Sequence, residues 1–85
     1  MRKLVWENIA YNLQDALDEL QKLDNLISSG NLPDESEFQV AMEHIYHHLN
    51  FAWNARHNSI ENDNNLTKDQ FRQWAKFPED LNLYE

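Results

Sequence analysis

Three histidines in the middle of the chain are the first residues whose spacing suggests chemistry. His44 and His48 are four residues apart, which places both on one flank of a helix at the spacing of a two-point metal chelate. His47 falls on another side, so a third ligand for a divalent transition metal has to come from another helix or a second copy of the chain. The favoured alternative is that these histidines hold no metal and line an interface or face solvent.

The segment from Leu49 to His57 is the second candidate, because it is dense in Trp, Asn, Arg and His. Arg56 continues the apolar line of a helix, so its guanidinium is expected to be partly buried and to need a carboxylate or carbonyl partner. One hypothesis is an anion-binding pocket formed by Trp53, Arg56 and His57. The favoured hypothesis is structural, with Arg56 tying the third segment to the helices before it. The candidate carboxylates are Glu7, Glu79, Asp80 and those of a second subunit.

A long helix is predicted over about residues 4–29, since apolar residues recur there at alternating gaps of three and four. Ala10 and Leu17 widen this stripe, so the helix is expected to face more than one neighbour. Gly30 suits the left-handed residue that ends a helix. The stripe consists of Trp6, Ile9, Leu13, Ala16, Leu20, Leu23 and Ile27.

A second helix is predicted over about residues 35–57, and Asp34 with Glu37 forms the capping box that starts it. A polar loop is expected over 58–66. Thr67 then caps a short helix over about 68–77, which a tail follows over 78–85. The apolar stripe of the second helix consists of Phe38, Met42, Ile45, Leu49 and Ala52.

These elements predict an all-α fold in a single helical domain over residues 1–85. The two long helices form an antiparallel hairpin, to which a short third helix is added. One hairpin and one short helix cannot bury two broad apolar stripes and ten aromatic residues. Two hairpins are therefore expected to pair as a dimeric four-helix bundle. The alternative is a three-helix monomer in which Phe71 and Trp74 close the groove.

Composition limits the possible partners. The formal net charge of −8 argues against nucleic acid and against an anionic membrane surface, and the lack of cysteine excludes disulfides and thiolate metal sites. No apolar segment resembles a signal peptide or a membrane span, so a cytoplasmic protein, complete as given, is expected.

The sequence therefore predicts a small acidic interaction module that forms a homodimer and is not an enzyme. Between Lys22 and Arg56 it has five carboxylates and no Lys or Arg, which favours a basic protein partner. The alternative is a ligand- or metal-binding helical bundle that uses His44 and His48, or Arg56 and His57.

Overall fold

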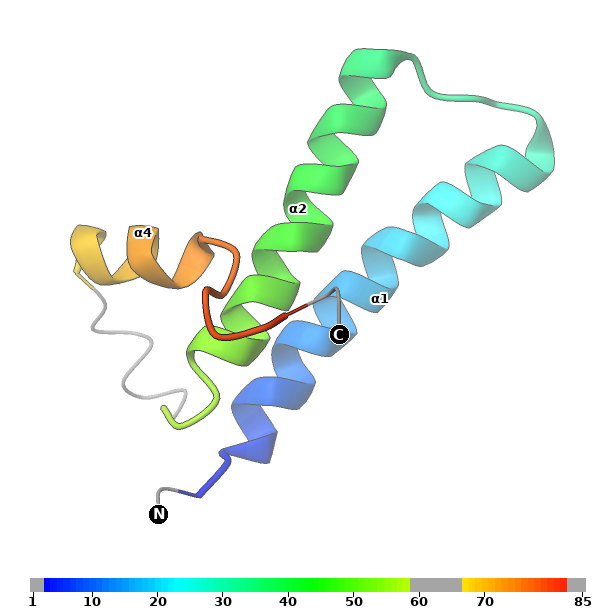
Figure 1. Cartoon of the computed structure of the whole chain (residues 1–85). Helices are drawn as coiled ribbons and strands as arrows, with labels where there is room; N and C mark the ends of the chain where they lie inside the picture. Colours follow the sequence, from blue (N-terminus) through cyan, green and yellow to red (C-terminus); the bar gives the residue numbers. More distant parts are fainter. Residues whose placement is uncertain (1–2, 59–66, 83–85) are drawn as a thin grey trace.

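The computed structural model describes residues 3–58 and 67–82, which are helical or irregular and contain no strand. Helices α1 (Trp6–Ser29) and α2 (Glu35–Asn54) form an antiparallel hairpin, and α4 (Lys68–Ala75) packs on the side of α2 away from α1 (Figure 1). The all-α hairpin with a short additional helix is thus confirmed. Most of the predicted polar loop (59–66) and the end of the tail (83–85) lie outside the described residues. No helix in the described ranges combines the length and the apolarity that crossing a lipid bilayer requires.

The helix ends follow local sequence signals. Gly30 adopts the left-handed conformation (φ 81°), and its N–H bonds back to the carbonyl of Ile27. The Asp34 carboxylate accepts the N–H of Glu37 (2.8 Å), and the Glu37 carboxylate accepts the N–H of Asp34 (3.2 Å). This is the predicted capping box. The hydroxyl of Thr67 caps α4 in a similar way. However, α2 and α4 end two to three residues earlier than the sequence indicated.

Only part of each predicted stripe lies in the core between α1 and α2. In α1 the buried members alternate with exposed ones, because a single neighbouring helix covers only about half of a stripe this wide. The remaining members lie on one side of the hairpin that no helix covers. The C-terminal segment reaches this side, where Asp80 contacts Trp53 and Arg56. The buried apolar residues of the hairpin core are Ile9, Ala16, Leu23, Ile45, Ala52 and Ala55.

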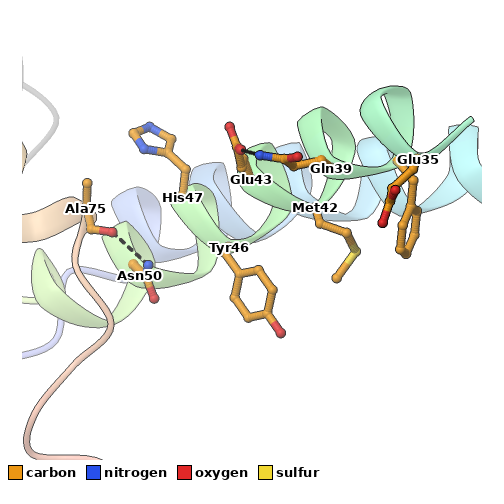
Figure 2. Close-up of a pocket in the computed structure, with 9 residues that line it drawn as sticks. Glu35, Gln39, Met42, Glu43, Tyr46, His47, Asn50 and Ala75 are labelled. Atoms are coloured by element: carbon orange, nitrogen blue, oxygen red, sulfur yellow. Dashed lines mark hydrogen bonds between the residues drawn. The ribbon is translucent and has the colours of Figure 1, made fainter.

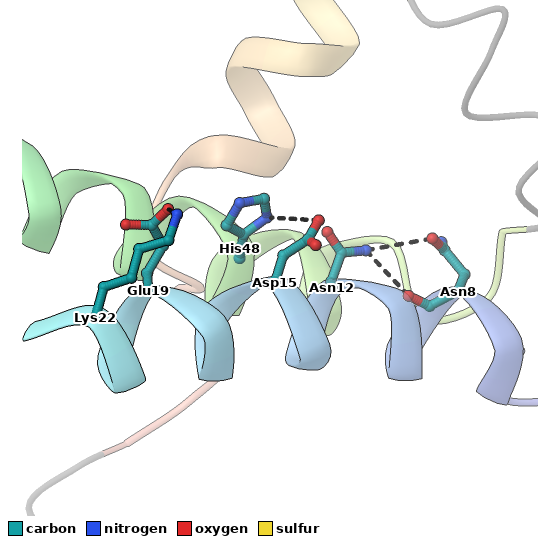
Figure 3. A network of polar contacts seen from close by, with 6 residues as sticks. All are labelled: Asn8, Asn12, Asp15, Glu19, Lys22 and His48. Carbon is teal, nitrogen blue, oxygen red and sulfur yellow. Dashed lines mark hydrogen bonds and ion pairs between the residues drawn. The ribbon is translucent and has the colours of Figure 1, made fainter. Parts of the chain in front are cut away.

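A buried asparagine ties the beginning of α1 to the end of α2. Asn8 is only 1% exposed, and its amide donates to the carbonyls of Ala55 (3.2 Å) and Asn58 (3.0 Å). Asn12 in turn donates to the side-chain and backbone oxygens of Asn8 (Figure 3). Asn8 therefore holds the turn that follows α2 against the beginning of α1.

Helix α4 is fixed to α2 by two further asparagines and a group of rings. Asn50 donates to the carbonyl of Ala75 (2.7 Å), and Asn54 donates to the carbonyls of Trp74 and Lys76 (both 2.8 Å). The rings of Phe71 and Trp74 pack against Phe51, with centroids 5.1 and 6.1 Å away. Amide capping and ring packing together position α4.

Candidate interaction surface

One side of the hairpin carries exposed apolar residues from both long helices. On α1 these exposed residues belong to the same stripe as the core residues, but they lie on the part of the stripe that faces away from α2. Trp6, for example, is 66% exposed. Contiguous apolar surface of this kind marks interaction sites in soluble proteins. We call this surface the open face. Its exposed residues are Leu4, Trp6, Leu13, Leu17, Leu20 and Ile27 from the first segment, and Phe38 and Leu49 from α2; the half-buried Met42 and Trp53 of α2 complete it.

A groove crosses the open face where the beginning of α1 lies beside the end of α2. Its volume is about 280 Å³, and its walls are almost entirely carbon. Because both helices contribute walls, their exposed apolar rows face the same side. The lining residues are Leu4, Trp6, Ile9, Leu13, Leu49, Ala52, Trp53 and Arg56.

Arg56 borders this groove and is held by protein groups. Its guanidinium lies 4.0 Å above the Trp53 ring and donates to the Trp53 carbonyl (2.8 Å). Asp80 in the C-terminal segment lies 3.7 Å from the guanidinium and also accepts the indole N–H of Trp53 (2.9 Å). The segment over 78–82 crosses α2 toward α1 (Figure 1). Asp80 is thus the carboxylate that the structural hypothesis for Arg56 required.

The predicted anion-binding residues are not brought together as a group. Trp53 and Arg56 share Asp80, whereas the His57 ring nitrogen lies 3.0 Å from the Lys3 carbonyl oxygen. His57 does not line the groove that Trp53 and Arg56 border. Asp80 already supplies the negative charge beside this guanidinium, so an anion at Arg56 would compete with it.

The histidine cluster lies on the other side of the hairpin, near α4. His48 Nδ1 is buried without a hydrogen-bond partner among the described residues, and it is 3.8 Å from a carboxylate oxygen of Asp15 (Figure 3). His44 and His48 line an open groove with Glu19, Glu43, His47 and Phe71. Over residues 3–58 and 67–82, no three His, Asp or Glu side chains are arranged to hold a metal ion. Metal binding by His44 and His48 therefore stays a prediction that needs a further ligand from elsewhere.

His47 packs beneath α4. Its ring centroid is 4.6 Å from that of Phe51 and 5.2 Å from that of Phe71. Burial lowers the pKa of His47 below its ordinary value, and the nearby charges of His48 and His44 lower that pKa further. These contacts make the neutral ring of His47 part of the packing between α2 and α4.

A second groove, of about 630 Å³, runs along the outer side of α2 (Figure 2). Its apolar surface comes from a row of side chains spaced four residues apart: Phe38, Met42 and Tyr46. Glu35 and Glu43 also line it, so the groove combines apolar and acidic character. It continues from the edge of the open face toward the end of α4 at Ala75.

The roles of four asparagines were not predicted from the sequence. Asn8 and Asn12 are four residues apart, as are Asn50 and Asn54. A spacing of four places both amides of each pair on one helix face beside the apolar stripe. This spacing is the feature of the sequence that could have indicated their structural role.

No protein-family model matches the chain, and comparison with curated proteins and with solved structures finds no match either.

Proposed function

We propose that this protein is a small helical interaction module whose open face packs against the open face of a second copy. Two hairpins then form a four-helix bundle, with each α4 on the outside. The observation that carries this proposal is the row of exposed apolar side chains on each of α1 and α2, which meet in the groove at the beginning of α1. Such a row is typical of a helix that has a further helical neighbour.

The magnitude of apolar burial supports association. Fully burying a leucine-sized side chain contributes about 1.5–3 kcal/mol. The open face offers ten such residues in each copy, although several are already half covered. Partial burial of this set in both copies is of the same order as, or larger than, the roughly 4–15 kcal/mol that association costs in lost freedom.

The test is the mass of the protein in solution. Light scattering coupled to gel filtration at micromolar concentration is expected to give about twice the 10.2 kDa mass of the chain. Leu17→Glu should shift the protein to monomer, because it places a charge within the interface. Leu17 is 54% exposed within one hairpin, so this change leaves the hairpin core intact.

Tyr11→Glu is the matched control. Tyr11 is 62% exposed on α1, but it points away from the open face, so the variant should remain a dimer. A monomeric wild-type protein, or equal effects of the two variants, would contradict the proposal.

The acidic surface supports a second contact, with a basic protein. Where the groove of Figure 2 extends beyond the open face it presents Tyr46 and Glu43, which suits a segment with apolar and cationic side chains. Cross-links from a partner's lysines to Glu43, mapped by mass spectrometry in the native cell, are the expected result. Cross-links confined to other carboxylates would argue against this groove.

A further inference from the structure

We propose that the groove at Trp6 and Trp53 receives the loop end of a second copy that runs in the opposite direction, so that the two hairpins pack antiparallel. The loop end is the part of the open face around residues 24–38, and the terminal end is the part around the groove. This inference rests on the proposed dimer and specifies its arrangement.

The two ends of the open face differ in charge. No Lys or Arg occurs between Lys22 and Arg56, so the loop end has carboxylates alone. Asp24 follows Trp6 by eighteen residues, which is five helical turns and places it on the line of the open face. Glu35 lies at the start of α2 beside the row of apolar residues (Figure 2).

The terminal end carries both signs of charge, and its cations are Lys3 and Arg56. Lys3 is exposed and forms no ion pair among the described residues, while Arg56 pairs at 3.7 Å with the partly exposed Asp80. Two hairpins that run in the same direction would bring both acidic loop ends together. If the two hairpins run in opposite directions, each acidic loop end lies near the Lys3 of the other copy. Like charges are then far apart and opposite charges are close together.

Shape leads to the same arrangement. The apolar groove is at the terminal end, and exposed Ile27 and Phe38 are at the loop end. A two-fold axis perpendicular to the helices brings these side chains of each copy toward the groove of the other. Both grooves are filled by one operation, and the two copies make identical contacts.

Distances between spin labels test the direction. The chain has no cysteine, so Ser28→Cys and Ala10→Cys each give a single labelling site. Both positions are exposed, and they lie eighteen residues apart along one line of α1 beside the open face. In the antiparallel dimer, labels on Ser28→Cys in the two copies should be about 25–30 Å apart, as should labels on Ala10→Cys. Mixing the two labelled chains should give a clearly shorter distance.

Short distances in each single variant, with a long distance in the mixture, would overturn the antiparallel arrangement. The dimer itself would still be supported by that result. Absence of any distance between copies would instead contradict the proposed dimer. The two failures are therefore distinguishable.

Lys3→Gln gives an independent check that does not use labels. In the antiparallel dimer it removes an attraction to the opposite loop end, so the dimer dissociation constant at low salt should rise about two- to five-fold. The difference should vanish at high salt because exposed charges are then screened. A tighter dimer would show that Lys3 faces cations, as it would if the two copies ran in the same direction.

Discussion

The ring of His47 is packed in a way that disfavours its protonated form. It packs against Phe51 and Phe71, and burial is the main cause of its lowered pKa. The unfolded chain therefore takes up a proton at this site before the folded chain does. The stability that neutral His47 provides is complete above the ordinary pKa of 6.5 and is lost as the pH falls through the lower pKa of the folded state.

We expect His47→Phe to reduce the loss of stability between pH 7.5 and pH 5, because phenylalanine keeps the ring contacts but cannot be protonated. Urea unfolding midpoints of both proteins across this range measure the effect. An unchanged pH slope in His47→Phe would assign the acid sensitivity to other groups.

Arg56 is a second single residue with an unusual position, because it is a cation that continues the apolar stripe of α2. The Trp53 ring and carbonyl contact the guanidinium, and Asp80 supplies the opposite charge. Because the Asp80 side chain is 59% exposed, the ion pair itself contributes less than about 1 kcal/mol. The contact with the Trp53 ring is the stronger reason for the position of Arg56.

At the scale of elements, α4 depends on amides from α2 rather than on its own core. The structure gives α4 no buried residue, yet Asn50 and Asn54 satisfy three carbonyls at its C-terminal end. Helices as short as α4, which has eight residues, are unstable in isolation. Its position is therefore determined by hydrogen bonds from a neighbouring helix.

Asn54→Ala should consequently destabilise the protein by about 1–2 kcal/mol, since two carbonyls lose their donor. The loss of hydrogen-exchange protection should be concentrated in residues 68–75. Asn25→Ala is the control, because this exposed amide of α1 accepts a bond only from the neighbouring Gln21 side chain in the described structure. If exchange in α4 were the same in both variants, the amide caps would not hold α4.

At the scale of the whole molecule, the chain is extended for its length. Its radius of gyration is 14.7 Å, whereas a compact chain of this length is expected to have about 12 Å. A hairpin with one open side has a large surface relative to its core, which leaves a monomer with a small margin of stability.

If association supplies the missing burial, the melting temperature should rise with protein concentration by mass action. Scanning calorimetry over a hundred-fold range of concentration measures this rise for the wild-type chain and for Leu17→Glu. The variant should melt at one temperature throughout. A wild-type melting temperature that does not change with concentration would show that folding and association are not linked.

The sequence by itself determined the helices and their ends, because these depend on local signals. The capping box of Asp34 and Glu37 and the left-handed Gly30 involve residues at most a few positions apart. The antiparallel hairpin followed from a short connection between two amphipathic helices.

Only the tertiary structure decided which half of each stripe is buried and which partner each polar group has. Asn8 is polar and lies outside the apolar stripe of its helix, but it is buried because the end of α2 lies beside it. Asp80 was one of several possible partners for Arg56, and the path of the C-terminal segment selected it. Both outcomes depend on contacts between residues more than twenty positions apart, which periodicity does not specify.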